Sequence, residues 1–100
     1  DDKVYNYALQ LIRATREHAF LVQGASPRAS LYLVRLAKAM AMLMGRDYVL
    51  PGDVAVQFPY VISHRMVLRN SAIMKGIKKQ DVIQDILKRT KQPSIGVKRR

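Results

Sequence analysis

Residues 24–45, GASPRASLYLVRLAKAMAMLMG, decide the fold, because they contain the strongest predicted helix of the chain and both of its ends. Ser26 is a favourable N-cap, since its hydroxyl can accept a hydrogen bond from a free backbone N–H group. Pro27 suits the first helical position, where no donor is needed, and Gly45 is typical of the residue that ends a helix. We therefore predict a helix over residues 27–44.

The apolar residues of this helix form a wide stripe. They are Leu33, Leu36, Ala37, Met40, Ala41 and Met44, with Leu31, Val34 and Met42 at the margins. A helix this apolar is expected to be central and to contact neighbours on several sides. Its methionines would also suit a binding groove for several partners, but we favour ordinary core filling.

Arg28 lies in the first turn of the same helix, beside the positive end of its dipole. A cation there is unfavourable by a few tenths of a kcal/mol to about 1 kcal/mol. The cost becomes a gain if an anion binds, because a helix N-terminus attracts phosphate and the guanidinium adds a forked, permanently charged donor. From the residues alone, Arg28 is either half of a phosphate site or an exposed arginine tolerated at a helix start.

The segment before this helix predicts an amphipathic helix over residues 3–18 and then a loop over residues 19–26. The inward face of the amphipathic helix is expected to consist of Val4, Ala8, Leu11, Ile12 and Thr15. The rest of the chain predicts a third helix from Pro51, which Pro59 is expected to kink or split. Residues 65–69 predict at most a short extended segment, and residues 80–91 predict a last helix with Val82, Ile83, Ile86 and Leu87 inward.

These elements define an all-α fold, a small bundle of four to five helices in residues 1–91. A flexible basic tail is expected over residues 92–100, which contain few apolar groups. The chain begins with Asp and not with Met, so we expect it to be part of a longer protein. No apolar run approaches the roughly 20 residues that span a bilayer, and no signal-peptide pattern is present.

The 100 residues contain no cysteine and carry a net charge of +11, which is concentrated toward the C-terminus. Residues 75–100 hold nine Lys or Arg against two Asp. Such a stretch can bind nucleic acid or acidic protein surfaces, or it can be a solvated helix face and tail. We favour the solvated face, because no aromatic residues interleave with the basic ones as stacking platforms.

The sequence offers no catalytic apparatus and no metal site. His18 is expected on the surface near a helix end, and His64 is expected to pack or to form hydrogen bonds. Neither histidine has the neighbours of a nucleophile triad or of a metal cluster. There is also no phosphate loop of the form G-x-x-x-x-G-K-[ST], so we expect no activity from this chain alone.

The order of several motifs closely resembles the C-terminal lid domain of MoxR-type AAA+ ATPases. The motifs are a helix ending in Thr15–Arg16, the loop GASPRA at 24–29, GRDYVLPGDV at 45–54, and His64–Arg65. The resemblance covers residues 3–70 well and the last helix more loosely. Gly52 departs from the family, in which an acidic residue is common at this position, and the third helix therefore has a slightly weaker start.

The resemblance implies a role for Arg28. In AAA+ proteins the nucleotide lies between a larger α/β core and this lid, and the lid contributes an arginine called sensor 2. Arg28 matches that position, with Ser26 and Pro27 shaping the helix N-terminus. It would contact the γ-phosphate and couple hydrolysis to lid rotation. ATP and magnesium are expected in the full-length protein, with none bound by this fragment alone.

The resemblance also implies partners. They are the protein's own AAA+ core, neighbouring subunits of a hexameric ring, and von Willebrand factor A domain proteins, in chaperone-like remodelling in the cytoplasm. We expect no membrane partner and do not favour nucleic acid. Two alternatives remain open, an independent basic helical domain that binds nucleic acid and a protein–protein adaptor. Tight, strongly salt-dependent DNA binding would favour the first of these alternatives.

Overall fold

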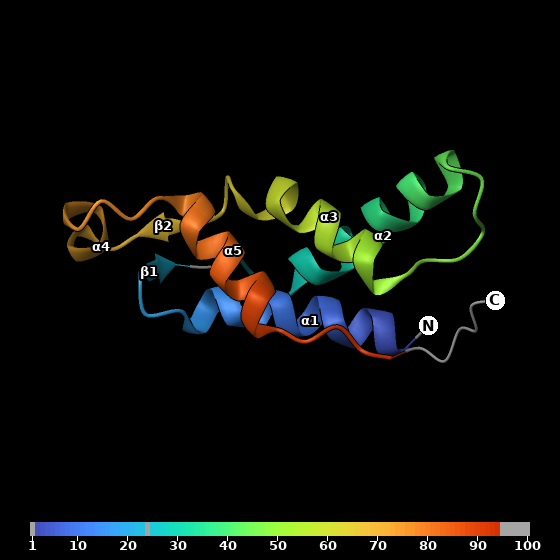
Figure 1. Ribbon diagram of the computed structural model, residues 1–100, viewed down its shortest axis with the longest axis horizontal. Helices are drawn as coiled ribbons and strands as arrows, with labels where there is room; N and C mark the ends of the chain where they lie inside the picture. Colours follow the sequence, from blue (N-terminus) through green and yellow to red (C-terminus); the bar gives the residue numbers. More distant parts are fainter. Residues whose placement is uncertain (1, 24, 95–100) are drawn as a thin grey trace.

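The computed structural model describes residues 2–23 and 25–94, which form a helical bundle with one small sheet (Figure 1). In chain order the elements are α1 (Asp2–Glu17), β1 (Leu21–Gln23), α2 (Arg28–Leu43), α3 (Pro51–Ile62), β2 (Val67–Leu68), α4 (Asn70–Met74) and α5 (Lys79–Arg89). The predicted all-α class is confirmed, with five helices among the described residues. Residues 95–100 of the expected tail lie outside the described residues, and the flexibility of the tail stays a prediction.

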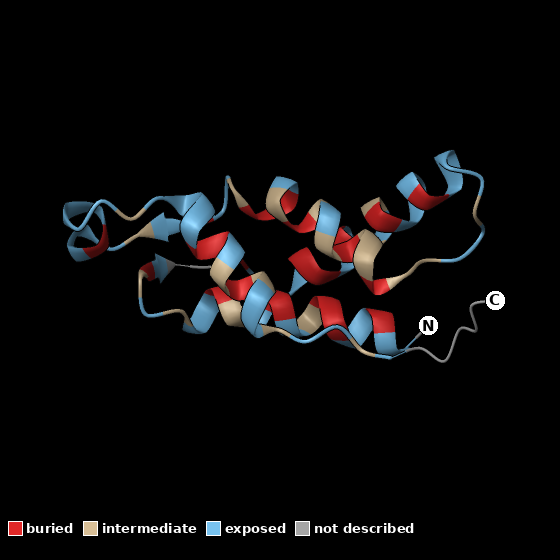
Figure 2. Ribbon diagram, viewed as in Figure 1, coloured by how far each residue is buried: buried red, intermediate tan, exposed pale blue. Residues whose placement is uncertain are grey.

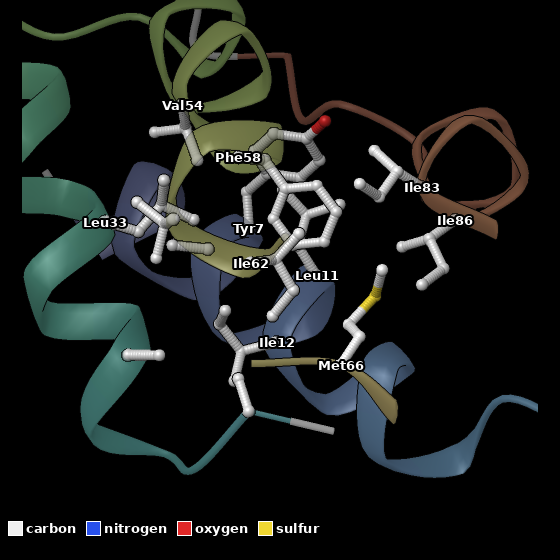
Figure 3. Packing of buried hydrophobic residues seen from close by; sticks show 14 of the residues in the cluster. Tyr7, Leu11, Ile12, Leu33, Val54, Phe58, Ile62, Met66, Ile83 and Ile86 are labelled. Atoms are coloured by element: carbon white, nitrogen blue, oxygen red, sulfur yellow. The ribbon is translucent and has the colours of Figure 1, made fainter. Parts of the chain in front are cut away.

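The core lies between α1, α2 and α3, and α5 closes one side of it (Figures 1 and 2). The buried residues of α1 recur every three or four positions and are Val4, Tyr7, Ala8, Leu11, Ile12 and Thr15. This set includes all five residues predicted for the inward face of α1. Figure 3 shows Leu33 of α2 and Phe58 and Ile62 of α3 in the same cluster. From α5, the cluster receives Val82, Ile83 and Ile86, while Leu87 is half-buried at its edge.

α2 contacts both α1 and α3, as predicted for a central helix, but the prediction that its methionines fill the core is wrong. Its buried residues are Ala29, Ser30, Leu33, Ala37 and Ala41, which form a single narrow stripe. Met42 and Met44 are 61% and 71% exposed, so the methionines at this end do not fill the core. The physical reason is that α2 reaches past the other helices at its C-terminal end, where nothing among the described residues covers it (Figures 1 and 2).

Pro59 does not split the third helix, so the part of the prediction that expected a split is wrong. α3 continues from Pro51 to Ile62 with Pro59 inside it. Proline removes one backbone donor, but this loss falls in the last turn, where few bonds depend on it. The carbonyl of Pro59 accepts a hydrogen bond from the Ser63 N–H at 3.1 Å, so the turn still closes.

β1 and β2 form a two-stranded antiparallel sheet in which Leu21 pairs with Leu68 and Gln23 with Val67, with an irregular register between the two pairs. The expected extended segment at residues 65–69 is confirmed in β2. The expectation of a plain loop over residues 19–26 is wrong for β1, because a strand of three residues depends on a partner far along the chain. Arg69 extends the pairing, since its N–H donates to the Phe20 carbonyl at 2.8 Å.

Candidate functional site

Arg28 begins α2, and its side chain is exposed. It forms no hydrogen bond or ion pair with any part of the chain that the structure describes. Pro27 has helical backbone angles of φ −57° and ψ −25°, as expected for a proline at a helix start. The guanidinium is therefore a permanently charged group, held at the start of a helix and available to a ligand.

The local geometry corrects the expected role of Ser26. No side-chain hydrogen bond caps α2; the carbonyl of Ser26, not its hydroxyl, accepts the Ala29 N–H at 2.9 Å. The Ser30 N–H likewise donates to the Pro27 carbonyl at 3.1 Å. Because these two N–H groups already have partners, the first turn attracts an anion mainly through the guanidinium and the helix dipole.

Two buried hydroxyl groups flank the segment that leads into Arg28. Thr15 and Ser30 are the buried polar residues among those the structure describes, and both are 0% exposed. The Thr15 hydroxyl donates to the Ile12 carbonyl at 2.6 Å and accepts the Ala25 N–H at 3.1 Å. The Ser30 hydroxyl donates to the Pro27 carbonyl at 2.7 Å. The segment before Arg28 is thus attached at both ends to buried parts of the bundle.

The structure joins some of the sequence motifs and leaves others apart. The bond between Thr15 and Ala25 links the Thr15–Arg16 end of α1 to the GASPRA loop. By contrast, Arg65 donates to the Val61 carbonyl at 3.2 Å, close to it in sequence at the end of α3. His64 is exposed, and no hydrogen bond connects its side chain to the rest of the described chain. The expectation that His64 packs or forms hydrogen bonds is therefore wrong.

His18 is not on the surface, contrary to the prediction. Its side chain is only 7% exposed, and its Nε2 lies 2.8 Å from Oδ2 of Asp85 on α5. The Phe20 N–H donates to Nδ1 at 3.1 Å, so a ring with its proton on Nε2 satisfies both contacts. Asp85 also accepts a bond from Arg89 at 3.1 Å. The hydrogen bond from His18 is the main cause that lowers the pKa of Asp85 below its ordinary value.

A second polar contact fixes the connection between α2 and α3. Both terminal nitrogens of Arg46 donate to the carboxylate of Asp53, each at 2.7 Å. The same carboxylate accepts the Leu50 N–H at 2.7 Å and so caps the start of α3. The hydrogen bond from Arg46 is the main cause that lowers the pKa of Asp53, and the Leu50 bond acts in the same direction. Asp53 therefore links Arg46, just after α2, to the start of α3.

Sequence reasoning located Arg28 but missed the groups that hold its loop. A signal was present for Thr15, a hydroxyl-bearing residue on an otherwise apolar helix face, and such a residue requires a buried partner. No signal marked Ala25 as that partner, because the bond joins residues on two different elements.

None of the described helices is both long and apolar enough to cross a membrane.

Residues 9–86 match the family described as the AAA lid domain, and the chain belongs to that family. Its relatives confirm the predicted resemblance to the MoxR type. "Chaperone MoxR1" of Mycobacterium tuberculosis is 34% identical over 99 residues, which cover 90% of this chain and 26% of that protein. "Protein MoxR" of Methylorubrum extorquens is 39% identical over 69 residues, which cover 68% of this chain and 19% of that protein.

Two further comparisons agree. "Uncharacterized protein YeaC" of Bacillus subtilis is 36% identical over 93 residues, which cover 93% of this chain and 29% of that protein. A crystal structure from Cytophaga hutchinsonii, named as that of "a putative ATPase", matches with a TM-score of 0.86 and 33% identity over 94% of this chain and 31% of that one. The chain thus spans less than a third of each of these proteins.

Proposed function

We propose that this lid closes over ATP bound to a AAA+ core and that Arg28 acts as its sensor 2 residue. The observation that carries the proposal is the exposed guanidinium of Arg28, which has no partner among the described residues and lies at a helix start whose approach is fixed by buried hydroxyls. In the free domain the positive end of the helix dipole disfavours a cation at this position. When a phosphate is present, the dipole and the guanidinium both attract the same anion, and the arrangement becomes favourable.

In this mechanism the core of the full-length protein supplies the phosphate loop and the magnesium ion. Arg28 contacts the γ-phosphate and stabilises the charge that develops as the terminal phosphoryl group is transferred. After phosphate release the contact is lost, and the lid moves relative to the core. The domain alone binds neither ATP nor magnesium in this proposal, because most phosphate contacts belong to the core.

The wider setting of the proposal follows the MoxR resemblance. The full-length protein would act in the cytoplasm as a chaperone-like ATPase that assembles as a hexameric ring. Its lid would contact its own core and the neighbouring subunit. Proteins with von Willebrand factor A domains would be its partners. A protein named as a chaperone among the relatives supports the remodelling role.

The test is steady-state ATP hydrolysis by the full-length protein. Losing one preorganised donor to developing charge costs roughly 10²- to 10³-fold in kcat, and we expect Arg28→Ala to reach the lower end or less, since the magnesium ion remains. Arg28→Lys should recover only part of the rate, because an ammonium group cannot reproduce the planar fork.

The matched control is Arg35→Ala, which removes an exposed arginine from the same helix about two turns farther along. It should leave hydrolysis near the unmodified rate. Equal rates for Arg28→Ala and Arg35→Ala would show that Arg28 does not touch the nucleotide, and the sensor assignment would then be wrong.

A further inference from the structure

Thr15 and Ser30, the two polar residues of the described bundle with 0% exposure, both bond to the same short segment, the one that leads into Arg28. Thr15 holds the backbone of Ala25, and Ser30 holds the carbonyl of Pro27. Beyond this segment the described core is formed by hydrophobic residues, and the nearly buried His18 side chain bonds to Asp85 beside it. Buried polar groups are costly unless they are satisfied, so two fully buried hydroxyl groups on one short segment indicate a requirement at that segment.

Thr15 makes its contact across two elements, whereas Ser30 bonds within its own turn. The hydroxyl of Thr15 both donates to Ile12 and accepts from Ala25, so it uses its proton and one lone pair. Ala25 is itself buried, and its N–H would lose its partner if the hydroxyl were removed. Valine would fill the same volume on α1, and packing alone therefore does not require the hydroxyl.

We propose that Thr15 is a positioning residue for Arg28, acting through the backbone of Ala25. The inference rests on the proposed sensor role. The bond from Ala25 fixes the chain three residues before Arg28, and the Ser30 bond fixes it one residue before. A guanidinium that must meet one phosphate oxygen in a given geometry depends on such a fixed backbone, because small misplacements of reacting groups lower rates strongly.

Thr15→Val and Thr15→Ser separate positioning from packing in the full-length protein. Valine keeps the volume and removes the hydroxyl, whereas serine keeps the hydroxyl and removes a methyl group. The affinities for a non-hydrolysable ATP analogue and for ADP are measured for both variants. ADP lacks the γ-phosphate, so a displaced Arg28 should weaken binding of the analogue and spare binding of ADP. We expect Thr15→Val to reduce the preference for the analogue by about threefold to tenfold.

Thr15→Ser should keep this preference within about twofold of the unmodified protein, even if its melting temperature falls. Ile86→Val is the packing control, because Ile86 is buried on α5 and loses one methylene far from the loop along the chain. Equal losses of ADP and analogue affinity in Thr15→Val, or the same change in Ile86→Val, would overturn the proposal. If Thr15→Val does not fold, Ser30→Ala replaces it with the same expected pattern.

The double variant Thr15→Val/Arg28→Ala distinguishes failure of this inference from failure of the sensor assignment. If Thr15 acts through Arg28, the double variant should match Arg28→Ala alone in kcat within about twofold. A loss equal to the product of the two single losses would refute the positioning role and leave the sensor role intact. If Arg28→Ala alone has no effect, the sensor assignment itself is wrong, and so is any inference that rests on it.

Discussion

At the scale of single residues, Arg28 stands in an unfavourable place for stability. A cation near a helix N-terminus opposes the dipole, and no neighbour among the described residues compensates it. The isolated domain should therefore be as stable after Arg28→Ala as before, or more stable by a few tenths of a kcal/mol. Thermal unfolding of the domain measures this. A loss above about 1 kcal/mol would identify Arg28 as a structural residue.

Asp53, in contrast to Arg28, is expected to stabilise the fold, because its carboxylate accepts hydrogen bonds both from Arg46 and from the Leu50 N–H at the start of α3. Asp53→Ala should lower the free energy of unfolding by about 1–2 kcal/mol, the usual cost of losing a cap together with a charged partner. Asp47→Ala is the control, since Asp47 is exposed in the same connection and has no partner among the described residues. It should change stability by less than about 0.5 kcal/mol.

Acid titration tests the same carboxylate. The bond from Arg46 lowers the pKa of Asp53 in the folded state, so its stabilisation is present above the unfolded-state pKa of about 3.9. That stabilisation is lost as the pH falls through the lower folded-state pKa. The unmodified domain should thus lose more stability below about pH 4 than Asp53→Asn does. Identical pH profiles from chemical denaturation would show that the contact does not form in solution.

At the scale of elements, the sequence predicted what local periodicity determines. α1, α2 and α5 were each located to within one or two residues, and the start of α3 was predicted at Pro51, because apolar spacing and end signals are local. The end of α3 was not predicted, since Pro59 was expected to kink or split the helix. β1 and α4 were not predicted. Both are very short, and β1 exists only through its pairing with β2. The exposed methionines of α2 were also misjudged, since periodicity cannot tell a buried stripe from an apolar face that reaches beyond the bundle.

The candidate site was likewise predicted only in part from the sequence. Arg28 could be found from its position in a motif, because a charged residue after Ser–Pro at a helix start is visible in the sequence. The bond from Ala25 to Thr15 and the contact of His18 with Asp85 join different elements. Such bonds depend on how the helices cross, and spacing along one helix carries no information about them.

At the scale of the whole molecule, the isolated chain should fold as a helical domain and hydrolyse no ATP. Its hydrophobic cluster contains residues from four helices, so the chain can bury a core of its own. In the proposed function the phosphate-binding loop belongs to the separate AAA+ core domain. Circular dichroism and a coupled ATPase assay on the purified 100-residue domain check both statements. Turnover by this domain alone would contradict the proposed division of labour between core and lid.

The length of α2 has a mechanical consequence. The helix runs for 16 residues, or about 24 Å, from Arg28 to Leu43 without a proline or glycine inside it. Its far end carries exposed Met42, Leu43 and Met44. A tilt of about 10° around the first turn would move that end by about 4 Å, since a helix transmits rotation as a stiff rod. In the proposed function α2 would therefore act as a lever, with the charged Arg28 near its pivot and an exposed apolar surface at its far end.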